Sequence, residues 1–85
     1  MSSGDDQEFL ARPVKRSFTI KGHRTSISME AQFWEALQQA AALEDTSLAG
    51  LVATIDKSRG DAGLSSAVRV WILDYYRKQA LSASR

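Results

Sequence analysis

The sequence predicts a small, mainly α-helical domain that begins with a short β-ribbon and is completed by a second copy of the chain. The chain has 85 residues, of which 44% are hydrophobic and 25% charged, which is ordinary globular composition. It has no cysteine, so disulfides and thiolate metal sites are excluded and self-association is favoured as support for a thin core. Alternating residues near the N-terminus are followed by three segments with helical periodicity.

Residues 1–13 are expected to be a flexible N-terminal arm, because they are rich in serine, glycine and aspartate and end at Pro13. The domain is expected over residues 14–80, and residues 81–85 are expected to be a tail. Residues 1–7 contain no apolar run, and the longest mostly apolar stretch, 48–55, is too short to span a bilayer. We therefore expect a soluble, cytoplasmic protein with no membrane partner.

Residues 14–29 are predicted to be extended. Phe18 and Ile20 share one parity, with polar residues on the other, and the phase reverses after Gly22. Beyond Gly22 the more apolar set is Thr25, Ile27 and Met29, and the polar set is Arg24, Ser26 and Ser28. A reversal at a glycine indicates a bulge or a turn, so either a bent strand or a small hairpin fits.

Residues 30–44 are predicted to form the first helix. Its apolar stripe follows three- and four-residue steps and consists of Phe33, Ala36, Leu37, Ala40 and Leu43, widened by Trp34. Ser28 is the expected N-cap, and Glu30 is expected in the first turn, where the helix dipole favours an acid.

Residues 48–58 are predicted to form a second helix, with Thr46 and Ser47 as capping candidates. Its apolar stripe is Leu48, Leu51, Val52 and Ile55. After a turn at residues 59–63, a third helix is expected over residues 65–80, capped by Ser65 or Ser66. Its main stripe is Val68, Trp71, Ile72 and Tyr75, with Val70 and Leu73 on the far side. A helix that is apolar nearly all round suits packing both within its own chain and against a second one.

The net charge of +1 hides an uneven distribution. Residues 12–24 contain five basic residues, the single histidine and no acid, whereas residues 30–56 contain five acids and no base. The basic segment is either an electrostatic footprint for phosphates or a solvated flank that keeps the protein soluble.

Catalysis finds little support in the sequence. His23 has no cysteine to pair with and lies in a basic strand, and we find neither a phosphate-binding glycine loop nor a dinucleotide fingerprint. We therefore expect no enzyme, no cofactor and no metal site.

The order of the elements suggests how the ribbon is used. A lone strand leaves its backbone groups unpaired, and two chains can repair this by pairing their strands antiparallel about a two-fold axis. The expected product is a two-stranded ribbon lying on four helices. One face carries Thr25, Ile27 and Met29 into the core, and the other exposes Arg24, Ser26 and Ser28. Such a ribbon fits the major groove of DNA.

Two motifs then resemble a known family. RTSISME at residues 24–30, followed by FWEAL at 33–37, resembles the strand and first helix of ribbon-helix-helix DNA-binding proteins. Residues 47–52 look like the start of their second helix, although residues 64–68 open in a similar way. The run at residues 15–28 is similar to a small bacterial group of single-domain proteins considered DNA binders, and the resemblance covers about residues 14–78.

The resemblance implies an intertwined homodimer, here with an added C-terminal helix, that places a β-ribbon in the major groove of double-stranded DNA. The implied base contacts fall on Arg24, Ser26 and Ser28. The N-terminus of the second helix, at Thr46 and Ser47, is implied to hold a phosphate. Lys15, Arg16, Lys21 and His23 are further expected phosphate contacts. The expected dimer core is Thr25, Ile27, Met29, Phe33, Leu37, Leu51, Val52 and Ile55.

Two functions remain open at this point. The first is a dimeric, sequence-specific DNA-binding protein acting as a transcriptional regulator, which the basic strand favours. The second is a dimeric protein-interaction module, such as an antitoxin or adaptor, that has a protein partner and uses the same fold without reading DNA. The acidic helices and the serine-rich ribbon favour this alternative.

Overall fold

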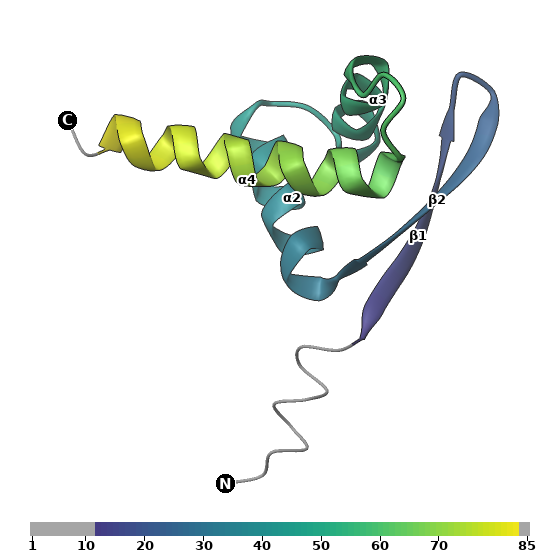
Figure 1. The fold of residues 1–85 in the computed structure, drawn as a ribbon, viewed down its shortest axis with the longest axis horizontal. Helices are drawn as coiled ribbons and strands as arrows, with labels where there is room; N and C mark the ends of the chain where they lie inside the picture. The colour runs from purple at the N-terminus through teal and green to yellow at the C-terminus, as the bar shows by residue number, and fades with distance from the viewer. Residues whose placement is uncertain (1–11, 84–85) are drawn as a thin grey trace, which may run out of the picture.

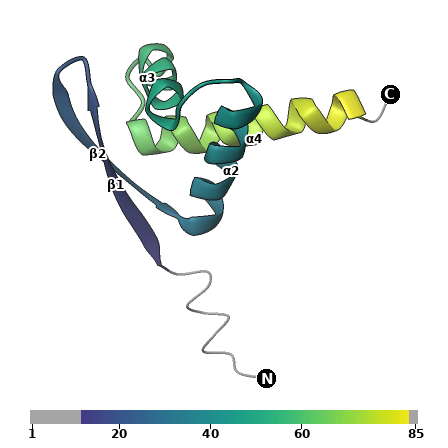
Figure 2. The ribbon, with the colours of Figure 1, turned by 180° about the vertical axis from the view of Figure 1, so that it is seen from behind.

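The structure is a computed structural model that describes residues 12–83. Within this range the chain forms strands β1 (Pro13–Ile20) and β2 (His23–Glu30), followed by helices α2 (Ala31–Leu43), α3 (Leu48–Ser58) and α4 (Leu64–Ala83). The two strands form an antiparallel hairpin on one side of the helices, and α4 crosses α2 (Figure 1). The view from behind shows the same arrangement (Figure 2). The predicted mainly α-helical fold with a β-ribbon at its start is confirmed.

The boundaries differ from the expected ones at both ends. Most of the expected N-terminal arm lies outside the described residues, but Pro13 is described and begins β1. Helix α4 continues to Ala83, three residues past its expected end. None of the described helices has the length and apolar character needed to cross a membrane.

The ribbon is a hairpin within one chain. Ile20 pairs with His23, and the two residues between them, Lys21 and Gly22, have positive φ angles of 51° and 81°. Positive φ at both loop residues is the geometry of a type I′ turn, whose twist matches that of the flanking strands. Within the described residues β1 of the same chain is the hydrogen-bonded partner of β2, and pairing of strands from two chains stays a prediction.

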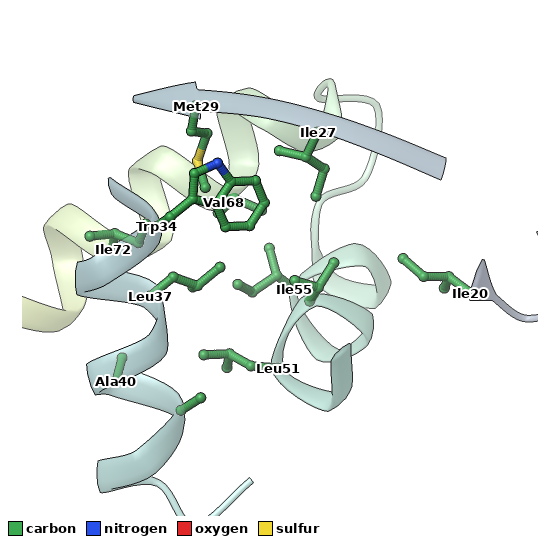
Figure 3. Close-up of a cluster of buried hydrophobic side chains, with 12 residues drawn as sticks. Ile20, Ile27, Met29, Trp34, Leu37, Ala40, Leu51, Ile55, Val68 and Ile72 are labelled. Atoms are coloured by element: carbon green, nitrogen blue, oxygen red, sulfur yellow. The ribbon is translucent and has the colours of Figure 1, made fainter. Parts of the chain in front are cut away.

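One face of the hairpin lies on the helices and forms part of the core. Ile27 and Met29 of β2 are fully buried, and Figure 3 shows both side chains pointing toward Trp34, Val68 and Ile55. The buried cluster draws on both strands and all three described helices: Ile20, Ile27, Met29, Trp34, Leu37, Ala40, Ala41, Leu51, Val52, Ile55, Val68 and Ile72.

The residues expected in a dimer core are core residues of the single chain. Six of them are buried without a second copy: Ile27, Met29, Leu37, Leu51, Val52 and Ile55. Thr25 and Phe33 are half-buried. These six side chains are therefore buried by residues of their own chain, and their place in a dimer core stays a prediction.

Helix α2 starts differently from its expected capping. Ser28 lies in β2 and is not the N-cap; Glu30 holds that position with an extended backbone. Glu30 therefore precedes the first turn instead of lying in it, and its carboxylate binds Arg69 of α4 at 3.0 Å. At the other end, the expected core residue Leu43 is 66% exposed because the helix ends there, and Ala41 is buried instead.

Helix α3 matches its expected range, and the Ser47 hydroxyl accepts a 2.9 Å hydrogen bond from the Gly50 amide, so the expected cap is confirmed. Helix α4 begins at Leu64, so Ser65 and Ser66 lie in its first turn and neither is the N-cap. Tyr76 Oη of α4 donates a 2.9 Å hydrogen bond to the Ala36 carbonyl of α2. This bond fixes the place where the two helices cross.

Candidate nucleic-acid interface

The outer face of the hairpin is formed by residues that pair across the two strands. In the observed register, Lys15 lies opposite Ser28, Ser17 opposite Ser26, and Thr19 opposite Arg24. Directly opposed residues project to the same face, and all six side chains are exposed. We call this set the outer face: Lys15, Ser17, Thr19, Arg24, Ser26 and Ser28.

The outer face combines two cations with four hydroxyls. Lys15 lies toward the base of the hairpin and Arg24 toward its turn, and the hydroxyls lie between and beside them. Ser17 Oγ and Ser26 Oγ are 3.1 Å apart and share a hydrogen bond across the strands. Residues 12–29 contain no acid, so the field over this face is positive. A hydroxyl can both donate and accept hydrogen bonds, and an arginine guanidinium can donate two hydrogen bonds side by side.

The acid nearest this face along the chain, Glu30, is engaged by a cation. Its carboxylate accepts a hydrogen bond from Arg69, which also lies 5.5 Å from the Phe33 ring centroid. A hydrogen bond from its backbone amide, followed by the bond from Arg69, lowers the pKa of Glu30 below its ordinary value. The ion pair offsets the negative charge at the base of the hairpin.

Two further expected phosphate contacts lie at the turn. Lys21 is a loop residue and exposed. His23 is also exposed, but it pairs with Ile20 and so belongs to the face opposite Arg24. Both side chains stand at the tip of the hairpin, flanking the outer face without forming part of it.

Arg16 lies on the other face of β1. It pairs with Ile27, and its guanidinium carbon is 5.4 Å from the Trp34 ring centroid, within the range of a cation–π contact. The structure therefore separates Arg16 from Lys15 and Arg24, with which the sequence grouped it as a basic segment.

Thr46 and Ser47 lie at the start of α3 and belong to a different element from the outer face. The Ser47 hydroxyl caps the helix, and a Cβ atom added at Gly50 would lie 2.7 Å from Thr46 Oγ1, so both side chains fold over the first turn. Nearby, Tyr75 Oη donates a 2.9 Å hydrogen bond to Glu44 of the preceding loop. Partial burial, followed by this hydrogen bond, raises the pKa of Tyr75.

Ser17 and Thr19 belong to the outer face, although neither was predicted as a site residue. Their parity marks them as polar, but they join Ser26 and Arg24 only in the hairpin register. The phase reversal at Gly22 is the sequence feature that predicts their position, provided that it is interpreted as a two-residue loop. Across such a loop, odd-numbered residues of β1 face the same way as even-numbered residues of β2.

Among residues 12–83, no group of three or more histidine, cysteine, aspartate or glutamate side chains is arranged to hold a metal ion.

The order of hairpin, α2 and α3 is that of a known domain. The family model described as "Ribbon-helix-helix domain" matches residues 13–76, most of the chain. The chain belongs to the ribbon-helix-helix family. Comparisons with curated proteins and with solved structures gave no match. The matched segment of this ribbon-helix-helix protein runs from the first residue of β1 to Tyr76 within α4, and the fold is typical of DNA-binding regulators.

Proposed function

We propose that this ribbon-helix-helix protein is a dimeric, sequence-specific DNA-binding protein that acts as a transcriptional regulator and inserts its hairpin into the major groove. The observation that carries the proposal is the outer face of the hairpin. It is exposed, acid-free and composed of groups that can hydrogen-bond to base edges.

The dimensions of the hairpin suit this role. Two paired strands lie about 4.8 Å apart, and eight residues in a strand extend about 26 Å. The major groove is about 12 Å wide and admits a two-stranded ribbon. A single chain already supplies both strands, so each subunit of a dimer has a complete ribbon to present.

The residue chemistry assigns roles along the ribbon. Arg24 is proposed to bind a guanine edge, since arginine donates two parallel hydrogen bonds to guanine N7 and O6. Ser26 and Ser28 are proposed as further base contacts, because a hydroxyl can pair with several base edges. Ser17 extends this row through its shared hydrogen bond with Ser26.

Phosphate contacts are proposed around the ribbon. Lys15, Lys21 and His23 lie at its base and tip, where they would meet the phosphates that line the groove. The amides near Thr46 and Ser47 at the start of α3 are proposed as a further phosphate site, because a helix N-terminus attracts anions. Arg16 is left out, because it lies over Trp34 on the other face.

The proposal of a homodimer follows the family, whose members typically bind DNA as dimers. Two ribbons related by a two-fold axis would read a palindromic site, since the symmetry of the operator mirrors that of the protein.

The test is fluorescence anisotropy of a labelled random-sequence duplex, titrated with the protein at low and near-physiological salt. We expect binding that weakens as salt rises, because phosphate contacts release counterions. A labelled single strand of the same sequence is the control and should bind more weakly, because it offers no major groove. Absence of duplex binding at low salt would contradict the proposal.

The alternative is the dimeric protein-interaction module. One observation favours it: Val70, Leu73 and Leu81 of α4 are more than half exposed, so an apolar surface is open away from the ribbon. Capture of a specific protein partner by a form that does not bind duplex DNA would support this alternative.

A further inference from the structure

The outer face of the hairpin carries positive charge that no described acid neutralises. Among residues 12–83 the acids in ion pairs are Glu30 and Asp56, and neither is paired with Lys15 or Arg24. Lys15 and Arg24 are both exposed, and residues 12–29 contain no acid. An open surface of one charge sign attracts groups of the other sign. The outer face is therefore suited to binding an acidic segment of protein as well as the phosphates of DNA.

The chain carries an acidic segment directly before the hairpin. Residues 1–11 contain Asp5, Asp6 and Glu8 and no basic residue. They lie outside the described residues, which begin at Arg12, one residue before the start of β1. We call the three acids the acidic cluster. Opposite charges are thus neighbours in the sequence, with the acidic cluster first and the basic segment second.

The acidic cluster is close enough along the chain to reach both ends of the outer face. Pro13 begins β1 at the base of the hairpin, and Thr19, which pairs with Arg24, lies six residues further along the strand. Six residues of a strand extend about 20 Å. Asp5 precedes Pro13 by eight residues, which can span at most about 29 Å. The difference leaves about 9 Å for a reversal of the chain, so the cluster can reach Arg24 as well as the nearer Lys15.

The hydroxyls between the two cations add a hydrogen-bond donor for a carboxylate. Ser17 Oγ and Ser26 Oγ lie 3.1 Å apart and share one hydrogen bond. Each hydroxyl has one proton, so the pair uses one proton between its members and keeps the other for a further acceptor. Both side chains are exposed. A carboxylate above this pair would accept a hydrogen bond while lying between Lys15 and Arg24.

Covalent attachment to the hairpin strengthens a contact of this kind. An exposed charge pair contributes little free energy, so a separate acidic peptide would bind the outer face weakly. A short linker instead holds the acids near the face at an effective concentration in the millimolar range. The acidic cluster of the same chain is therefore favoured over a separate acidic molecule as the occupant of the outer face when no DNA is present.

We propose that the acidic cluster binds the outer face of the hairpin in the same chain and has to leave before DNA can bind. Its carboxylates then occupy the positions that the proposed function gives to phosphates and base edges. The contact can exist without DNA, but its effect on DNA binding rests on the proposed function. The apparent dissociation constant for DNA equals the intrinsic one divided by the fraction of chains whose outer face is open. The acidic cluster thus lowers the affinity of the protein for every duplex.

The first experiment detects the contact without DNA. Backbone amide chemical shifts of the isotope-labelled, full-length protein are compared by NMR between wild type and the double variant Asp5→Asn/Asp6→Asn at low salt. We expect the shifts to change at the outer face and to stay the same at Leu37 and Ile72, which are buried in the helices. High salt should remove the difference between the two proteins, because salt screens exposed charges.

The second experiment measures how tightly each form binds the labelled random-sequence duplex at low salt. Asp5→Asn/Asp6→Asn should bind about threefold more tightly than wild type, as expected for the loss of two exposed charge pairs. A threefold change corresponds to an outer face that is covered in about two-thirds of the chains. Asp61→Asn/Asp74→Asn is the matched control, because it removes two exposed acids from the helical part of the protein and changes the net charge equally. The control should change duplex binding much less and should leave the shifts of the outer face as in wild type.

The two experiments separate this proposal from the DNA-binding one. Outer-face shifts that depend on Asp5 and Asp6, in a protein that binds no duplex, would support the contact while rejecting the proposed function. A duplex-binding protein whose outer-face shifts are the same in wild type and in both double variants would do the reverse. Equal gains in duplex affinity from the two double variants would also overturn the proposal, because they would show an effect of net charge alone.

Discussion

The indole Nε1 of Trp34 donates a 2.8 Å hydrogen bond to the carbonyl oxygen of Val14. The same ring lies 6.0 Å from the Phe18 ring and 5.4 Å from the Arg16 guanidinium carbon. One side chain of α2 therefore contacts three alternate residues of β1. Because β1 is held from its inner side, Lys15, Ser17 and Thr19 must face outward, so Trp34 determines which side of the hairpin is presented.

Removal of this hydrogen bond should loosen β1. Trp34→Phe keeps an aromatic ring but removes the indole donor to the Val14 carbonyl, so we expect a loss of about 1 kcal/mol in the free energy of unfolding from this hydrogen bond. Urea denaturation measures the change. Trp71→Phe is the matched control, since half-buried Trp71 stacks on Tyr75 and does not hold the hairpin. Equal losses in the two variants would contradict the role given to Trp34.

Gly22 is expected to be required for its backbone conformation. An added Cβ atom would meet nothing within 4 Å, so Gly22→Ala tests the positive φ angle of 81° without a steric clash. We expect Gly22→Ala to lower the free energy of unfolding by about 1 kcal/mol, because alanine is strained in the left-handed conformation. Thermal or chemical unfolding measures the change. Gly22→Asn should lose less, because asparagine tolerates this region. A neutral Gly22→Ala would show that the turn is not the observed type.

Much of the fold could be predicted from the sequence because its signals are local. The range of α3 and its Ser47 cap follow from helical periodicity and a preceding serine. The start of α2 could not be predicted in this way. Ser28 has the chemistry of an N-cap, but pairing with Lys15 extends the strand to Glu30, and a cross-strand partner is invisible to local patterns. Leu43 also has the spacing of the apolar stripe of α2, but it is the last residue of that helix and lies past the packed core, so it is exposed.

Ser47 should stabilise the protein through its cap. Ser47→Ala removes the acceptor of the Gly50 amide, and the loss of such caps is typically about 1 kcal/mol. The neighbouring Thr46→Ala is the control and should have a smaller effect on the midpoint of urea unfolding. If the two variants were equally destabilised, the hydrogen bond would not explain the contribution of Ser47.

The lowered pKa of Glu30, caused first by its backbone hydrogen bond and then by Arg69, should make stability depend on acid pH. The pKa of Glu30 in the folded state lies below its ordinary value of 4.5, so its contribution is complete above that value and is lost as pH falls through the lowered one. Glu30→Gln should therefore be less stable than wild type at neutral pH and nearly equal in strong acid. Urea unfolding across this range measures the difference, with Glu35→Gln as control. A constant difference between wild type and Glu30→Gln would rule out the linkage.

The candidate interface was harder to predict than the fold because it depends on register. Arg24, Ser26 and Ser28 were identifiable from alternation within one strand. Their partners across the hairpin required knowledge of the two-residue loop. Arg16 belonged to the basic segment by sequence, yet its parity places it over Trp34, so a run of charges does not define a charged face.

The most direct test of the central claim compares Arg24→Ala with Arg16→Ala in duplex binding by fluorescence anisotropy, with folding of both variants verified by circular dichroism. The two residues lie on opposite faces of the same hairpin, so the comparison removes equal charge from the outer and inner sides. We expect Arg24→Ala to weaken binding by about 1–3 kcal/mol, as for loss of a bidentate base contact, and Arg16→Ala to weaken it much less. Unchanged binding by Arg24→Ala, or an equal loss in both variants, would contradict the assignment of the outer face to DNA.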